Sequence, residues 1–475
     1  MTETRSSSSE ASAPHPPRRI NRFTLYFFGA LGGILFGYDL GVISGVLVLI
    51  AKSWNLSGFE KGVLTASLSV GAMVGAGLAT RLNNAIGRKR SIMVAAGIVI
   101  LGTVACSLAP NFGTLTAFRF LLGIGIGFSS ATVPTYLSEL APMRIRGAMS
   151  ALNQIFIVLG ILIAFLVDYW LAPTGSGSWR WMFFGAIVPA TVLLIGMNFL
   201  PETPRWLLNL GREEEARAVL AATHGSGAGE VDREVAEIRE VIRLDREGAL
   251  GRVRDLAARW VRPMLFVALL LAIGQQFSGV NAINAYFPTM LVTLGFTTST
   301  ALFSAVILGI TKFVFTAWVV FVVDRWGRKP LLLIGNVVMV LTLLLTGFVV
   351  QDVHSKGALG SLTLILLVLY LAGYELGWGA VVWVMMAEIF PLKVRGAGMG
   401  TGAVVLWAST GLITAVFPIM SDKNHLGLGP SMWVFAGINA VLFFLTRWLV
   451  PETKGRSLEQ IELSLRGGAS ERVPS

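Results

Sequence analysis

A nine-residue stretch that occurs twice decides the fold of this chain. Glu139-Leu-Ala-Pro-Met-Arg-Ile-Arg-Gly147 recurs 249 residues later as Glu388-Ile-Phe-Pro-Leu-Lys-Val-Arg-Gly396. Two shorter motifs repeat as well: Gly87-Arg-Lys returns at Gly327, and Pro201-Glu-Thr returns at Pro451. A missed internal repeat misassigns a whole fold, so repeats are sought first. Three repeats in register indicate a duplicated unit.

The segments between these motifs are long and apolar. Apolar residues make up 54% of the 475 residues and charged residues only 14%, whereas soluble domains carry about 25% charged residues. A mean hydropathy of +0.70 excludes an ordinary soluble fold. A helix needs about 20 apolar residues to cross a bilayer. Twelve segments qualify: residues 23–48, 62–82, 91–109, 114–137, 149–171, 181–200, 264–292, 300–323, 331–350, 361–389, 397–421 and 431–450.

The repeats divide these spans into two equal sets, because they follow spans 2 and 8, 4 and 10, and 6 and 12. The sequence therefore predicts an all-α membrane protein with two pseudo-symmetric six-helix bundles, residues 23–200 and 263–450. Residues 201–262 form a cytoplasmic linker. Val231, Val235, Ile238 and Ile242 recur there at helical spacing, which predicts an amphipathic helix. This linker either takes part in gating or is simply solvated. Residues 1–22 and 451–475 are cytoplasmic tails, the first of them disordered because it is rich in Ser, Pro and Arg.

The distribution of basic residues predicts the orientation in the membrane. The net charge is +11, which in a soluble protein would suggest nucleic acid. Here 31 of the 38 Lys and Arg residues lie in the tails, in the loops after the even-numbered spans or in the last residues of those spans, and five lie in the opposite loops. Basic loops stay on the cytoplasmic side. We therefore expect a multi-pass protein of the cell membrane, plasma or inner, with both termini in the cytoplasm and no nucleic-acid partner.

Parallel repeats place a substrate site between the two halves, near the middle of the membrane. Rocking of one half against the other then gives alternating access. The repeated motifs combine Arg with Glu at the cytoplasmic ends of the helices, and such charges either latch the halves together or only anchor the helix ends. The glutamates favour the latch, because anchoring does not need them. The predicted cytoplasmic charge network is Arg88, Glu139, Arg146, Glu202, Arg328, Glu388, Arg395 and Glu452.

Further motifs extend the pattern beyond the repeats. They are Gly32-Gly-Ile-Leu-Phe-Gly-Tyr-Asp39, Arg119-Phe-Leu-Leu-Gly-Ile-Gly125, Pro201-Glu-Thr-Pro-Arg-Trp206, Gln275-Gln-Phe-Ser-Gly-Val-Asn281, Asp324-Arg-Trp-Gly-Arg-Lys329 and Pro451-Glu-Thr-Lys-Gly455. With these motifs the chain resembles the sugar porter family of the major facilitator superfamily, over about residues 20–465.

Two ionisable residues inside the first half are candidates for proton coupling. Charges at membrane depth are expensive and are functional hypotheses by default. Asp39 lies in the middle of the first span, and Arg119 lies near the outer end of the fourth. A carboxylate that alternates between an apolar setting and a nearby Arg can load and release a proton. The resemblance implies the same role for this pair; the alternative is a static ion pair.

Three more charges lie within the spans. Lys312 in span 8 and Glu375 in span 10 are unusual for the sugar–proton symporters of the family. They form either a structural ion pair or part of a substrate or proton site. Asp168 lies near the outer end of span 5, and we expect it to be exposed to water.

A sugar site needs amide donors and acceptors together with an aromatic platform. Gly274 and Gly279 predict that span 7 is bent or unwound around its Gln pair. The resemblance implies substrate contacts from Gln154, Gln275, Gln276, Asn281 and Trp378. Ile161, Leu406 and Ala285 replace polar residues of the family pattern, so a less hydroxylated or differently shaped substrate is expected. The full predicted substrate site is Phe36, Gln154, Gln275, Gln276, Asn281, Trp378, Trp407, Lys312 and Glu375.

These features predict a secondary active transporter that imports a sugar or polyol with a proton, working as a monomer in the lipid bilayer. The alternatives are an uncoupled sugar facilitator, a proton-coupled carrier of another metabolite such as a cyclic organic acid, and a non-transporting nutrient sensor. An enzyme is not expected, because no nucleophile–base arrangement occurs. No metal site, catalytic residue or cofactor is predicted, and the single Cys106 is expected to be a packing residue.

Overall fold

The computed structural model describes residues 22–142, 146–175, 177–224, 228–246, 253–351, 358–390 and 393–455. Within these ranges the side chains of residues 22–25, 146–148, 150, 224, 228, 244–246, 358 and 359 are outside the description. The predicted tail over residues 1–21 lies outside the described residues, as does the chain beyond residue 455. The side chain of Arg146, predicted to join the charge network, is also outside.

Twelve described helical segments are long and apolar enough to cross a membrane, as predicted. The first six spans are α1 (Arg22–Ser53), α2 (Gly58–Ile86), α3 (Arg88–Leu108), α4 (Phe112–Leu140), α5 (Arg146–Leu171) and the pair α6 (Ser178–Phe184) and α7 (Ile187–Asn198). The last six are α11 (Arg262–Phe277) with α12 (Val280–Thr293), α13 (Thr298–Trp326), α14 (Arg328–Gln351), α15 (Ala358–Tyr374) with α16 (Val381–Ile389), α17 (Arg395–Met420) and α18 (Leu428–Leu449). The predicted fold class is confirmed.

Local sequence explains where several of these helices begin. Ser57 caps α2 through a reciprocal capping box with Glu60, and Asn111 caps α4 in the same way with Thr114. The repeated Gly-Arg-Lys motifs separate α2 from α3 and α13 from α14. Gly87 has φ 91° and Gly327 has φ 92°, a backbone region that favours glycine. Equivalent glycines thus make equivalent corners in both halves.

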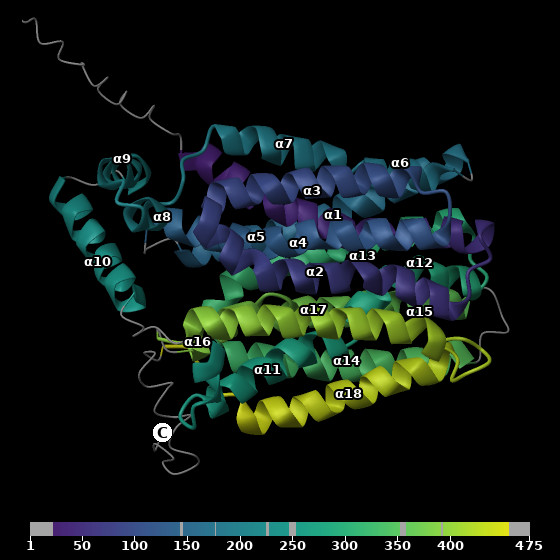
Figure 1. Cartoon of the computed structure of the whole chain (residues 1–475). Helices are drawn as coiled ribbons and strands as arrows, with labels where there is room; N and C mark the ends of the chain where they lie inside the picture. The colour runs from purple at the N-terminus through teal and green to yellow at the C-terminus, as the bar shows by residue number, and fades with distance from the viewer. Residues whose placement is uncertain are drawn as a thin grey trace, which may run out of the picture.

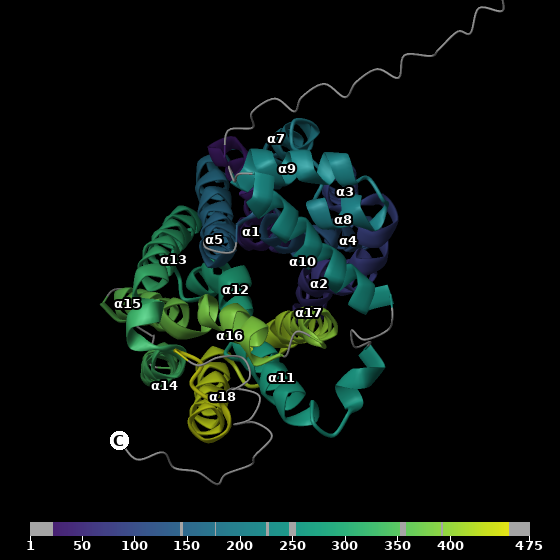
Figure 2. The same cartoon turned by 90° about the vertical axis from the view of Figure 1, so that its left-hand side faces the viewer.

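The helices form two groups that lie side by side. Figure 1 shows the spans running roughly parallel, with α8, α9 and α10 at one end. Figure 2, seen from that end, separates the N-terminal helices (purple to blue) from most of the C-terminal ones (green to yellow). The groups meet where α2 packs along α17, α5 along α13 and α1 along α12. We call the end that carries α8–α10 the linker end and the opposite end the far end.

The segment between the two groups is helical at the linker end. It contains α8 (Pro204–Asn209), α9 (Glu213–His224), α10 (Ala228–Arg246) and a short 3₁₀ helix, Val253–Ala257. The amphipathic helix predicted from the apolar spacing is α10, and it buries Val231 and Val235. Ion pairs from Arg217 to Asp232 and from Arg239 to Glu213 tie α9 to α10. A gating role for this segment stays a prediction.

Candidate functional site

A small cavity with several polar side chains in its wall lies between the two halves. Its lining includes Asp39 on α1, Thr65 on α2, Arg119 on α4, Asn281 on α12 and Thr410 on α17. Its volume is about 20 Å³, and roughly 10–15 Å³ suffices for one water molecule. In this conformation the cavity, which both Asp39 and Arg119 line, can therefore hold a water molecule but has no room for a sugar.

The structure brings Asp39 and Arg119 to the same cavity without pairing them. Each residue is 1% exposed. Among the described residues, neither carboxylate oxygen of Asp39 has a hydrogen-bond partner, and neither does Nη1 of Arg119. Nε of Arg119 donates to the Leu64 carbonyl oxygen at 3.1 Å, and the guanidinium lies 5.6 Å from the centre of the Phe183 ring. A static ion pair, the alternative to a coupling role, is therefore not formed in this conformation.

Three of the predicted amide side chains form a hydrogen-bonded chain at a break in span 7. The predicted break is confirmed: α11 ends at Phe277, and α12 starts after Gly279, whose φ is 100°. Nδ2 of Asn281 donates to Oε1 of Gln276 at 2.5 Å, and Nε2 of Gln276 donates to Oε1 of Gln275 at 3.1 Å. Because Asn281 also lines the cavity, this amide chain links the cavity wall to the buried side of α11.

The amide chain ends on an irregular part of span 10. Residues Glu375–Gly379 form a π-helical turn between α15 and α16. Nε2 of Gln275 donates to the carbonyl oxygens of Trp378, at 2.7 Å, and Gly379, at 3.3 Å. The Trp378 side chain is 0% exposed, and its Nε1 has no partner among the described residues. In this conformation, therefore, Trp378 reaches Gln275 through its backbone, while its indole ring packs beside Gly274.

The predicted aromatic platform crosses between the two halves. The rings of Phe36 on α1 and Trp407 on α17 have their centres 5.2 Å apart. Nε1 of Trp407 donates to Oγ of Ser130 on α4 at 3.4 Å. Gln154 lies on α5 and is partly exposed. The structure thus joins Phe36 to Trp407 and Gln275 to Trp378, and it does not join Gln154 to any of the other predicted site residues by a hydrogen bond.

Lys312 and Glu375 face each other inside the C-terminal group. Nζ of Lys312 lies 2.9 Å from Oε1 of Glu375, and the two side chains are 4% and 1% exposed. Oγ1 of Thr316 donates to Oε2 of the same carboxylate at 2.9 Å. Of the two roles left open by the sequence, the geometry matches the ion pair. The positive charge of Lys312 is therefore neutralised within the protein.

A cluster around Tyr286, to which the sequence assigned no role, joins the halves on the far-end side of the cavity. The Tyr286 hydroxyl on α12 lies 3.0 Å from the Lys61 carbonyl oxygen, 2.8 Å from Oγ1 of Thr65 and 3.1 Å from the Thr414 carbonyl oxygen. Lys61 and Thr65 belong to α2, and Thr414 belongs to α17. Thr65 and Thr414 also line the cavity. Single Thr residues in an apolar span give no signal in the sequence, so only the fold identifies this contact.

The expectation that Asp168 is exposed to water is wrong. Asp168 is 1% exposed, and its Oδ2 accepts a hydrogen bond from the backbone N–H of Gly45 on α1 at 3.0 Å. A Cβ at Gly45 would lie 2.4 Å from Cγ of Asp168. The carboxyl group is therefore buried because Gly45 has no side chain, and this contact between distant segments is invisible in the hydropathy of span 5.

We expect Asp168→Asn to be tolerated and Asp168→Leu to destabilise the protein. An amide oxygen can accept the Gly45 N–H in the same way, whereas Leu removes the acceptor and overpacks the contact, at a cost of about 1–3 kcal/mol. Thermal unfolding of the purified protein in detergent checks this. If Asn lowers Tm as much as Leu does, the negative charge itself is required, and this description of the site is wrong.

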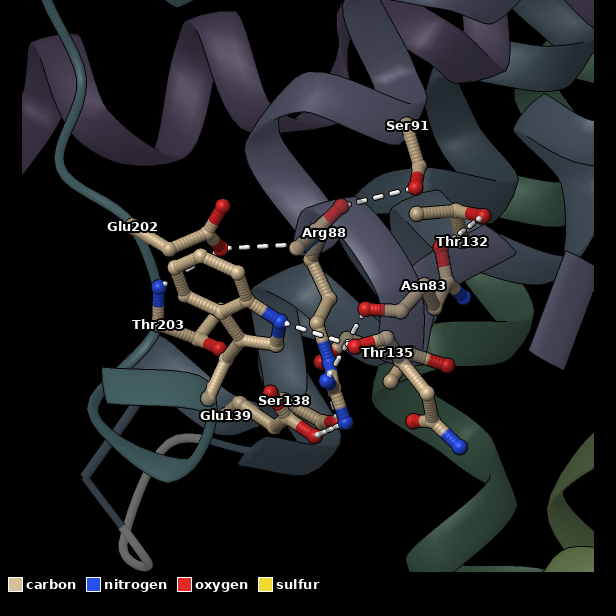
Figure 3. A network of polar contacts seen from close by, with 12 residues as sticks. Asn83, Arg88, Ser91, Thr132, Thr135, Ser138, Glu139, Glu202 and Thr203 are labelled. Carbon is tan, nitrogen blue, oxygen red and sulfur yellow. Dashed lines mark hydrogen bonds and ion pairs between the residues drawn. The ribbon is translucent and has the colours of Figure 1, made fainter. Parts of the chain in front are cut away.

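The described side chains of the predicted charge network form a separate cluster within each half. Figure 3 shows Arg88 between Glu139 and Glu202. Nη2 of Arg88 lies 3.0 Å from Oε1 of Glu139, and Glu202 accepts from the backbone N–H of Arg88 at 3.0 Å.

The C-terminal half repeats this arrangement. Nη2 of Arg328 lies 3.2 Å from Oε1 of Glu388, and Glu452 accepts from the backbone N–H of Arg328 at 3.1 Å. Arg395 instead donates to the Phe390 carbonyl oxygen. A latch between the halves stays a prediction for another conformation.

The two equivalent glutamates differ in their electrostatic setting. Burial raises the pKa of Glu202 above its ordinary value, although three backbone N–H groups and Arg88 oppose that rise. Burial also raises the pKa of Glu452, but four backbone N–H groups outweigh it and hold the pKa below its ordinary value. Glu452 therefore stabilises the folded state above the pKa of the unfolded chain and loses that effect as the pH falls through its folded pKa.

We expect Glu452→Gln to lower Tm more at about pH 7.5 than at about pH 3.5, because only the ionised carboxylate differs from the amide in charge. Glu202→Gln is the matched control. Because the pKa of Glu202 is raised in the folded state, the wild-type side chain contributes most to stability at low pH. The Tm difference between wild type and Glu202→Gln should therefore not grow towards neutral pH. Equal pH profiles for the two variants would contradict this assignment.

Two six-helix groups that meet along three helix pairs and enclose a cavity between them are the architecture of secondary transporters. The family model described as "Sugar (and other) transporter" matches residues 25–465. The chain is 37% identical to the glucose transporter GlcP of Staphylococcus epidermidis over 448 residues, 94% of this chain and 98% of that protein. It is 38% identical to the galactose–proton symporter of Escherichia coli K12 over 449 residues, 94% of this chain and 95% of that protein.

A solved structure of the xylose transporter XylE of Escherichia coli, in a partially occluded inward-open conformation, is similar as well. The TM-score is 0.80 at 28% identity, with 92% of this chain and 99% of that chain covered. The protein belongs to the sugar transporter family, which confirms the resemblance drawn from its motifs. It is a multi-pass membrane transporter and not an enzyme.

Proposed function

We propose that this protein imports a neutral sugar or polyol together with a proton. The observation that carries the proposal is the shared cavity: Asp39 and Arg119 line it together with Asn281, the last amide of the hydrogen-bonded chain. The proposed proton carrier, Asp39, and the proposed substrate ligand, Asn281, therefore lie at the same cavity, so that protonation of one can affect binding at the other. The relatives named above as glucose, galactose–proton and xylose transporters support this substrate class.

The separation of Asp39 from Arg119 gives the coupling step. A buried ionised carboxylate without a partner is costly at membrane depth. Asp39 is therefore either protonated, as we propose for this conformation, or paired with Arg119 after the proton leaves. Each proton state favours a different arrangement of α1 against α4, and differential stabilisation of two conformations is what shifts a population.

We propose that this conformation faces the cytoplasm. The Tyr286 contacts join α12 to both α2 and α17 and close the cavity towards the far end. At the linker end, the described ion pairs of the charge network stay within their own halves. If both termini are cytoplasmic, as the basic loops predict, the closed far end is the outer side. The similarity to an inward-open structure agrees with this orientation.

A carrier for a cyclic organic acid is the weaker alternative. It would require the Lys312 charge to bind a carboxylate, and that charge is already paired with Glu375 at 2.9 Å. The amides and the Phe36–Trp407 contact suit hydroxyls and an apolar ring face instead. We also propose that the protein acts as a monomer in the plasma or inner membrane, because the cavity is lined by both halves of one chain.

Uptake into proteoliposomes tests the proposal. The purified protein is offered a panel of labelled hexoses, pentoses, polyols and cyclic acids, with and without an inward proton gradient. We expect concentrative uptake of at least one neutral compound only with the gradient. Uptake that is identical with and without the gradient would support a facilitator, and preference for an acid would overturn the substrate class.

A further inference from the structure

The buried Lys312–Glu375 pair is connected to the amide chain through one helical turn, Glu375–Gly379, whose last two carbonyl oxygens accept from Gln275. The contacts of the pair indicate its role. Glu375 is the first residue of the π-helical turn, and Gly379 is its last. Turns of this kind are rare: they occur mostly as single turns inside α-helices, frequently at functional sites. This turn therefore needs support from tertiary contacts.

The Glu375 side chain lies over its own turn. A Cβ at Gly379 would be only 2.2 Å from Oε2 of Glu375. The same oxygen accepts from Oγ1 of Thr316 at 2.9 Å, while Oε1 meets Nζ of Lys312 at 2.9 Å. Lys312 and Thr316 are one helical turn apart on α13. One carboxylate thus connects both ends of the π-helical turn to two positions on α13.

The opposite side of the turn is fixed by close packing. A Cβ at Gly377 would lie 2.5 Å from the Leu331 carbonyl oxygen on α14. The turn is consequently held between the backbone of α14 on one side and the ion pair with α13 on the other. This position directs the carbonyl oxygens of Trp378 and Gly379 at Nε2 of Gln275.

We infer that the Lys312–Glu375 pair is a positioning device for the substrate amides. It holds the π-helical turn so that the Trp378 and Gly379 carbonyls orient Gln275, and Gln275 in turn orients Gln276 and Asn281. Neither charge touches substrate in this assignment. The inference rests on the proposed function in one respect, namely that these amides bind the sugar or polyol.

Replacing both partners of a buried ion pair distinguishes a positioning role from a contribution to stability alone. Removing one partner strands a buried charge, whereas replacing both partners by apolar residues of similar volume is often neutral for stability. The Lys312→Met/Glu375→Leu protein, called the Met/Leu variant below, should therefore fold, yet it lacks the carboxylate that connects the turn to α13. The Lys312→Gln/Glu375→Gln protein, called the Gln/Gln variant, keeps polar contacts without charge and serves as the conservative rescue.

The test is a double-mutant cycle with Gln275→Ala, read as KM and maximal rate of uptake of the best substrate from the panel. We expect the Met/Leu variant to raise KM about tenfold, with the maximal rate within about threefold of wild type. The Gln/Gln variant should restore most of the affinity. In the Gln275→Ala background, Met/Leu should change KM by less than about twofold, because coupled residues are not additive.

Three results would overturn the inference: an unchanged KM for Met/Leu, effects that multiply with Gln275→Ala, or a fall in maximal rate alone. If Met/Leu does not fold, Thr316→Val removes only the Oε2 contact, and the same cycle applies to it with a smaller expected rise. A wild-type protein that takes up no sugar or polyol would contradict the proposed function instead. In that case a structure of the Met/Leu variant still decides the inference, which expects residues 375–379 to leave the π-helical form.

Discussion

Proteoliposomes that contain the Asp39→Asn protein are expected to equilibrate substrate across the membrane but not to accumulate it. Asn keeps the shape of the side chain and cannot release a proton. With an inward gradient of about one pH unit, wild-type protein that moves one proton per substrate can reach about tenfold accumulation, since a tenfold ratio corresponds to about 1.4 kcal/mol. For Asp39→Asn the expected ratio is about one.

This expectation follows from where Asp39 lies. Its carboxylate lines the cavity between the halves and has no partner among the described residues, while Arg119 lies on the same cavity. A neutral side chain at this position needs no counter-charge in either conformation. The two conformations can therefore interconvert without a proton, and downhill exchange should continue.

Asp168→Asn is the matched control, because it makes the same chemical change at a second buried carboxyl in the N-terminal half. Asp168 contacts the backbone of α1 at Gly45 and does not line the cavity. Accumulation should survive in this variant. Accumulation by Asp39→Asn at the wild-type level would remove Asp39 from the coupling mechanism.

The second large effect is expected at Gly62, where the halves meet near the far end. A Cβ at Gly62 on α2 would lie 2.3 Å from the Ala415 carbonyl oxygen on α17. A backbone oxygen cannot rotate away, so Gly62→Ala must push the two helices apart in the present conformation. Overpacking of this kind costs about 1–3 kcal/mol, which shifts the population towards a far-end-open state.

We expect Gly62→Ala to slow uptake about tenfold and Gly62→Leu to abolish it, because closure at the far end belongs to every transport cycle. Gly77→Ala is the control on the same helix pair, since a Cβ there would lie 3.9 Å from Val404, an ordinary contact. Its uptake should match wild type.

Labelling reports the conformation directly. The native Cys106 is buried, so an Ile43→Cys protein carries one new thiol at the cavity wall. An impermeant thiol reagent added outside should label it faster in the Gly62→Leu background than with Gly62 intact. Equal labelling, with normal uptake by Gly62→Leu, would show that α2 and α17 do not form the outer closure.

The sequence predicted the large-scale structure because its determinants are local along the chain. Apolar runs long enough for a bilayer gave the twelve spans, and the repeat of Glu139–Gly147 as Glu388–Gly396 gave the two halves. Gly274 and Gly279 predicted the break in span 7, which the structure has. Asp39, Arg119 and Asn281 were recognisable as polar residues at membrane depth, and they share one cavity.

Contacts between distant segments were decided only by the tertiary structure. Asp168 looked exposed because its hydropathy says nothing about Gly45, 123 residues away. The sequence could not tell whether Lys312 and Glu375 face each other, and the structure places them 2.9 Å apart; the π-helical turn beside them has no signature in residue types. The Arg88 and Arg328 ion pairs lie within the halves and not between them. Hydrophobicity and bilayer thickness act on each segment by itself, whereas pairing depends on which backbones approach closely enough to bring two side chains together.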